Sequence, residues 1–227
     1  MVGIIGVAVL SLQGAMLGLL VVAVRRGNVA AAVNAFGALF LALLPAVVEF
    51  GLPVLLGQTF SLGAILPLWI AIAGVLHTIG MLGAYETTWW WDHLTHTVSA
   101  ALVAALLYAV IIVAAGRAGL AGIGTIGFTI AIGVFWELIE LVARDIGERL
   151  DVEPVLVHYG WRDTVADIGF DAVGALLVVG VDLRTFVPIV EQFPGLARAA
   201  LIGSGGVVVG GSLIMVLLLG IVRPTSA

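Results

Sequence analysis

The feature that constrains this chain most is a succession of seven apolar segments, each close to the ~20 residues with which a helix crosses a bilayer. They cover residues 2–24, 29–50, 65–85, 94–116, 120–143, 164–181 and 199–222. Lipid offers no water to pair with backbone polar groups, so segments of this kind cross it as helices. We therefore expect an all-α fold, a polytopic transmembrane helix bundle with about seven spans.

The composition supports a membrane protein and excludes several chemistries. Hydrophobic residues make up 62% of the 227 residues and charged residues only 10%, against ~25% charged in soluble domains. The seven segments leave little chain over, so we expect residues 1–227 to form a single integral membrane domain in the cell (cytoplasmic) membrane, surrounded by membrane lipid. Cysteine and lysine are absent, which excludes thiolate ligands and a lysine Schiff base. A net charge of −5 argues against nucleic acid as a partner.

The arginines predict how the chain is oriented in the membrane. If consecutive spans alternate in direction, one side carries six of the nine arginines, namely Arg25, Arg26, Arg144, Arg149, Arg162 and Arg223. The other side carries Arg117, Arg184 and Arg198. The positive-inside rule then places the amino terminus outside and the carboxyl terminus in the cytoplasm. Residues 145–162 are expected to extend the fifth segment's helix, with Asp145 and Arg149 spaced for an i,i+4 pair.

Ionisable residues gather at one end of three neighbouring segments. These residues are Asp92 and His96, Glu137 and Glu140, and the repeat of Asp163, Asp167 and Asp171 at every fourth position. The fourth and sixth segments begin, and the fifth ends, on the same side of the membrane. A charge in mid-membrane costs ~2.5–3.5 kcal/mol on the insertion scale. The three sets are therefore expected to share a polar interior.

Carboxylates combined with imidazole favour a divalent metal ion such as Mg²⁺, Mn²⁺, Zn²⁺ or Fe²⁺. Such an ion would also relieve the mutual repulsion of crowded acids. The predicted ligands are Asp92, His96, Glu137, Glu140, Asp167 and Asp171. Glu137 or His96 is the candidate catalytic base, and Arg144 and Arg162 are candidate partners for a substrate phosphate. His77, His93 and Asp163 are expected to support the ligands or to gate the site.

Several of these residues also have a simpler, purely structural interpretation. Asp163 has the position of an acid that complements the dipole at a helix amino end. His93 has the position of an interfacial histidine, and His77 that of a polar residue satisfied between helices. For the whole cluster the simpler interpretation is an inert hydrogen-bonded network.

Three blocks of sequence resemble the YjdF-type inner-membrane proteins, a family to which we attach no known activity. The blocks are 76–80 with Tyr85 followed by 91–96, then 136–140, then 163–167 with Gly174 downstream. The resemblance covers about residues 60–180 and leaves 2–24 and 199–222 as additional spans. It implies a compact multi-span bundle with these acids as its signature. The Asp92/His96 spacing alone is also similar to VanZ-like membrane proteins.

Three functions are compatible with this pattern. The first is a metal-dependent enzyme acting at the cytoplasmic interface on a lipid headgroup or on a lipid-linked or small-molecule substrate. The second is a proton or cation transporter or channel that uses the Asp163-Asp167-Asp171 stripe. The third is a non-catalytic membrane subunit. The sequence leaves open whether the chain is an enzyme and what its oligomeric state is.

Overall fold

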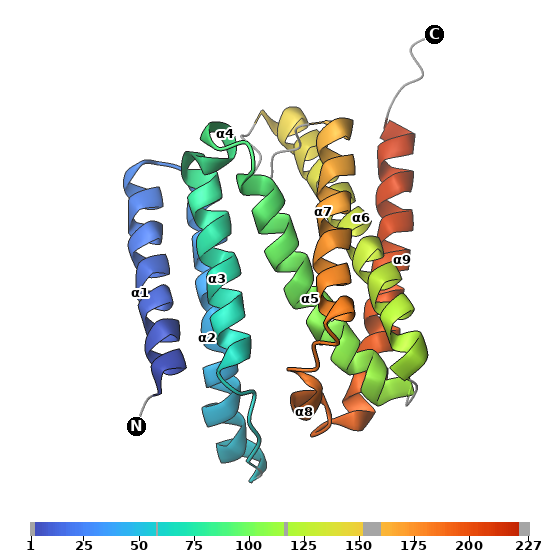
Figure 1. Ribbon diagram of the computed structural model, residues 1–227. Helices are drawn as coiled ribbons and strands as arrows, with labels where there is room; N and C mark the ends of the chain where they lie inside the picture. Colours follow the sequence, from blue (N-terminus) through green and yellow to red (C-terminus); the bar gives the residue numbers. More distant parts are fainter. Residues whose placement is uncertain (1–2, 58, 116–117, 152–159, 223–227) are drawn as a thin grey trace. The chain divides into compact units, whose positions relative to one another are not determined.

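The computed structural model describes residues 3–57, 59–115, 118–151 and 160–222, and within these ranges it contains helices and no strand (Figure 1). The elements are α1 (Ile4–Arg25), α2 (Val29–Leu56), α3 (Ile65–Ile79), the π-helix η1 (Gly80–Ala84), α4 (Tyr85–Thr87), α5 (Trp91–Ala115), α6 (Ala118–Leu150), α7 (Trp161–Gly180), α8 (Val187–Val190) and α9 (Pro194–Val222). The prediction of an all-α fold is confirmed.

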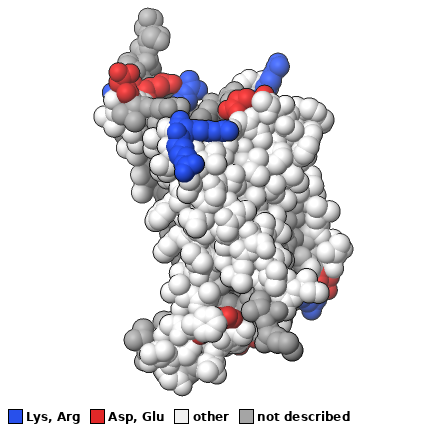
Figure 2. All heavy atoms as spheres, turned by 90° about the vertical axis from the view of Figure 1, so that its left-hand side faces the viewer, with Lys and Arg blue, Asp and Glu red and all other residues white. Residues whose placement is uncertain are grey.

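Among the residues that the structure describes, six stretches of helix are long and apolar enough to cross a membrane, which confirms a polytopic bundle. They are Ile4–Arg25, Val29–Gly51, Ile65–Thr87, Trp91–Ala115, Leu120–Leu150 and Pro194–Gly220. The remaining predicted span, 164–181, lies in helix α7. This helix contains three acids and is not among the six apolar stretches. On the face that Figure 2 shows, charged side chains gather toward two ends and the surface between them is uncharged. The orientation stays a prediction, and two of its arginines, Arg117 and Arg223, lie outside the described residues.

Several helix boundaries differ from those that the sequence predicts. Helix α2 continues past residue 50 and through Pro53 to Leu56, where the left-handed Gly57 ends it and donates its N–H to the Pro53 carbonyl at 2.9 Å. Helix α9 begins at Pro194 and not at 199, because proline is well suited to the first helical position. The extension of α6 to Leu150 is confirmed, and its Arg149 Nε lies 2.9 Å from Asp145 Oδ2. The rest of that connection, residues 152–159, lies outside the described residues.

The chain divides into two compact units, residues 1–102 and 103–227. In the first unit, helices α1, α2 and α3 pack against one another around Met16, Ala42 and Ala71, each of which is fully buried. Gly74 permits this close packing, because a β-carbon there would stand 2.7 Å from Ala38 Cβ and from Met16 Cε.

In the second unit, helix α6 packs against α7 on one side and against α9 on another. Small residues again set the approach of the helices. A β-carbon at Gly122 would stand 2.8 Å from Val179 of α7, and one at Gly211 of α9 would stand 2.6 Å from the Phe135 ring of α6. The single domain over residues 1–227 that the sequence suggests stays a prediction.

Candidate functional site

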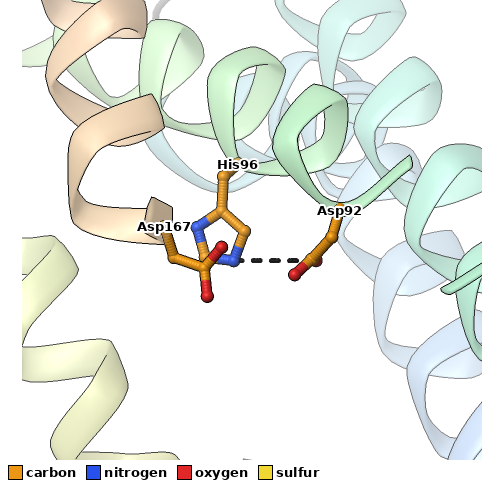
Figure 3. A group of neighbouring side chains, drawn as sticks. All are labelled: Asp92, His96 and Asp167. Atoms are coloured by element: carbon orange, nitrogen blue, oxygen red, sulfur yellow. Dashed lines mark ion pairs between the residues drawn. The ribbon is translucent and has the colours of Figure 1, made fainter. Parts of the chain in front are cut away.

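The first turns of α5 present Asp92 and His96 on one face of the helix. Four residues advance a helix by about one turn, so the two side chains project in nearly the same direction. His96 Nε2 lies 3.9 Å from Asp92 Oδ1, and Figure 3 draws this pair with a dashed line. The side chains are 13% and 26% exposed, respectively, so the pair is neither fully solvated nor fully enclosed. Thr95 donates its hydroxyl to the Asp92 carbonyl at 2.8 Å and fixes the start of this turn.

His77, on α3, is held by hydrogen bonds at both ring nitrogens. Its Nδ1 lies 2.7 Å from the Tyr85 hydroxyl, and its Nε2 lies 3.0 Å from Ser99 Oγ on α5. Ser99 follows His96 by three residues, so both lie on the side of α5 that carries Asp92. Within the first unit His77 is thus a satisfied polar residue between two helices, one of the two roles that the sequence suggests for it.

The π-helix that follows α3 brings Tyr85 back toward His77. Two glycines allow this turn. Gly83 adopts φ 126°, a conformation that side-chain-bearing residues rarely take. Gly80 lies directly under the Tyr85 ring, where a β-carbon would collide with three ring atoms. The Trp91 indole then donates to the Leu76 carbonyl at 3.0 Å and ties the start of α5 to α3.

In the second unit, three acids lie where α6 and α7 pack together, a contact region that we call the seam. Glu137, Asp167 and Asp171 are only 4%, 3% and 8% exposed. The helices run antiparallel, with Gly133 against Asp171 and Gly122 against Val179. Counting along this register places Glu137 at about the level of Asp167. Glu137, Asp167 and Asp171 are therefore buried within the second unit, and their role as metal ligands stays a prediction.

The other predicted site residues lie toward the helix ends. Glu140 accepts a hydrogen bond from the Trp136 indole at 2.8 Å. Arg144 pairs with Glu148 at 2.8 Å, and the Arg162 guanidinium lies 5.5 Å from the centre of the Trp161 ring. Both arginines proposed for a substrate phosphate therefore have neighbours of their own.

Two of the three residues predicted to support or gate the site, Asp163 and His93, also lie near helix ends. Asp163 stands in the first turn of α7, where its charge complements the helix dipole. His93 meets Trp89 edge to face, with ring centres 6.2 Å apart.

Sequence reasoning missed the partners of His77 and two buried hydroxyls. Tyr85 and Ser99 are separated from His77 by eight and 22 residues, and only a kinked helix brings Tyr85 near it. Thr125 and Thr129 are 0% and 2% exposed on α6. Their signal was available, since Thr125, Thr129, Gly133 and Glu137 recur every fourth residue.

Apolar helices of spanning length with acids buried between them define a polytopic α-helical membrane protein. The chain belongs to the family described as "Predicted membrane protein (DUF2238)", whose model matches residues 7–186. No curated protein and no solved structure significantly matches the chain. The likenesses to YjdF-type and VanZ-like proteins stay resemblances.

Proposed function

We propose that this membrane protein binds a divalent metal ion through Asp92, His96 and Asp167. The sequence predicts all three as ligands, and Asp92 and His96 lie together on α5, as Figure 3 shows. The observation that carries the proposal is the Asp92–His96 pair on α5, one turn apart with its nitrogen and oxygen at 3.9 Å. Metal sites in helix bundles commonly combine ligands at i and i+4 on one helix with an acid from another helix.

The donor set narrows the choice of metal. Two carboxylates and one imidazole suit Mn²⁺, Zn²⁺ or Fe²⁺ better than Mg²⁺, which prefers oxygen ligands and water. The ion also compensates the charge of Asp167, which is only 3% exposed. Three protein ligands leave coordination positions open for water or for an oxygen of a substrate, as in catalytic sites.

The position of the pair favours a substrate at the membrane interface. Asp92 follows Trp89, Trp90 and Trp91, and Trp89 is 81% exposed, as in the aromatic belts that lie among lipid headgroups. We therefore propose a metal-dependent reaction on a lipid or lipid-linked headgroup in the cell (cytoplasmic) membrane. If His96 ligates the ion it is no longer free to act as a base, which leaves Glu137 for that role.

Elemental analysis of the purified protein tests the metal site. The wild type, reconstituted with Mn²⁺ or Zn²⁺ and passed over a desalting column, is expected to retain about one ion per chain. Asp92→Asn, His96→Gln and Asp167→Asn should each lose it. Glu148→Gln is the matched control, because Glu148 is an acid with a 63% exposed side chain that pairs with Arg144. Wild-type protein that retains no ion after incubation with Mg²⁺, Mn²⁺, Zn²⁺ or Fe²⁺ would refute the proposal.

A further inference from the structure

The buried face of α6 is a single ridge that contains polar residues along most of its length. From Ala121 to Glu137 the buried residues recur every fourth position and are Ala121, Thr125, Thr129, Gly133 and Glu137. Residues four apart advance 40° around a helix, so these five form one slowly turning line of side chains. Three of the five are polar, and one of these three, Glu137, is ionisable, a kind of residue that is rare in membrane helices.

Helix α7 presents a matching ridge of Asp167, Asp171 and Ala175, all buried. The antiparallel register fixed by Gly133 with Asp171 and by Gly122 with Val179 places Thr129 at about the level of Ala175. By the same count Thr125 is at about the level of Val178. The α7 side chains at these two levels are small or apolar, and neither accepts a hydrogen bond.

The hydroxyls of Thr125 and Thr129 are buried without a hydrogen-bond partner in the described part of the chain. Helical threonines commonly donate to the carbonyl four residues earlier, as Thr78 does to Gly74 at 2.7 Å and Thr97 to His93 at 2.8 Å. Thr125 and Thr129 do not. A buried polar group without a partner is costly, and in proteins ordered water usually satisfies it.

We propose that water enters the seam between α6 and α7 and joins Asp171, Thr129 and Thr125 into a path for protons. Successive members of a ridge are separated by a rise of ~6 Å, a gap that one water molecule spans with two hydrogen bonds. Beyond Thr125 the seam leads toward the end of α7, where the exposed Asp182 follows. A proton that enters beside Asp171 displaces one that leaves at the other end, and a pH difference across the membrane drives the transfer.

The path contains none of the three ligands of the proposed metal site, and its two hydroxyls, Thr125 and Thr129, are not among the ligands that the sequence predicts. It goes beyond the acid stripe of α7, since the hydroxyls that extend the path belong to α6. The seam lies within the second unit alone. The proposal requires two things: water must reach Thr125 and Thr129, and protons must pass through these residues.

Cysteine accessibility tests for water in the seam, and the chain lends itself to the method because it contains no cysteine. Thr125→Cys and Thr129→Cys are expected to react with a small, charged methanethiosulfonate reagent, which requires an ionised thiol in contact with water. Ile123→Cys is the matched control, as Ile123 lies two residues from Thr125 and is 75% exposed on the apolar outside of α6. It should not react in vesicles. Unreactive Thr125→Cys and Thr129→Cys proteins that keep the wild-type melting temperature would overturn the proposal.

Proton flux tests transfer along the path. Proteoliposomes are filled with the pH-sensitive dye pyranine, and valinomycin with K⁺ clamps their membrane potential. The external pH is then changed in one step. The wild type and Thr129→Ser should show flux above that of protein-free vesicles. Thr129→Val, which keeps the shape but loses the hydroxyl, should fall to the protein-free level. Absence of wild-type flux, or full flux in Thr129→Val, would overturn the proposal.

Discussion

The carboxylate of Asp171, on α7, occupies the space that a side chain at Gly133 of α6 would fill. This relationship sets the register of the two helices, and it places Glu137 near the level of Asp167. A polar group is thus packed against bare backbone in the interior of the second unit, where a bulkier residue would separate the helices.

Replacement of Gly133 should therefore loosen the second unit. In Gly133→Ala the new methyl group collides with the Asp171 carboxylate, so we expect the free energy of unfolding to fall by about 1–3 kcal/mol. Gly127→Ala is the control, because a β-carbon there has no heavy atom within 4 Å. It should leave stability unchanged or raise it by up to ~1 kcal/mol through helix propensity. Unfolding of both variants in detergent measures the difference, and equal stabilities would contradict this packing.

The hydrogen bonds of His77 should stabilise the kinked end of α3. Tyr85→Phe removes the partner of Nδ1 and Ser99→Ala removes that of Nε2, and each should lower the free energy of unfolding by about 0.5–1.5 kcal/mol. Ser11→Ala is the control, since the Ser11 hydroxyl is exposed and bonds only to the Val7 carbonyl of its own helix. Its effect should stay within about 0.5 kcal/mol. If Tyr85→Phe and Ser99→Ala change the free energy of unfolding no more than Ser11→Ala does, the hydrogen bonds of His77 do not contribute to stability.

Asp182 should remain ionised at unusually low pH. A hydrogen bond from Arg184, at 2.9 Å, and then one from the Tyr108 hydroxyl, at 2.7 Å, lower the pKa of its carboxyl below the ordinary value. A carboxyl whose pKa is lowered on folding contributes stability above its unfolded pKa of ~3.9, and the contribution disappears as the pH falls through the folded value.

The comparison of wild type with Asp182→Asn tests this pH dependence. The difference between their melting temperatures should be constant from neutral pH down to about 4 and should shrink below it. Asparagine is a suitable replacement because it tolerates the left-handed conformation of this position, with φ 52°. In Arg184→Gln the pKa of Asp182, followed by carbon NMR, should rise toward its ordinary value. An unchanged pKa would exclude Arg184 as its main cause.

Much of the fold follows from the sequence because membrane spans are specified by length and hydropathy. The exceptions have identifiable causes. The sequence predicts the hydrophobic segment at residues 29–50, but α2 continues through Pro53 to Leu56. The π-helix depends on the close approach of Tyr85 to Gly80, which no periodicity reveals. Glu49 accepts hydrogen bonds from Ser61 Oγ at 3.0 Å and from the Gly63 amide at 3.2 Å, contacts that no spacing in the sequence indicates.

Only part of the candidate site could be predicted from the sequence. Spacing alone identified Asp92 with His96, and the acids of α6 and α7. It could not show that Arg144 and Arg162 have other neighbours, since those depend on rotamers at the helix ends. The four-residue spacing of Thr125 and Thr129 with Glu137 is visible in the sequence, but the burial of the two hydroxyls and their lack of a partner among the described residues are known only from the structure.

Metal affinity in single and double variants tests the central claim most directly. We predict that titration with Mn²⁺, followed by calorimetry, gives one site per chain whose affinity falls at least about tenfold in Asp92→Asn and in Asp167→Asn. If both carboxylates hold the same ion, the double variant should lose less than the sum of the two single losses in free energy. Wild-type affinity in Asp167→Asn, or strictly additive losses in the double variant, would contradict a site shared by these residues.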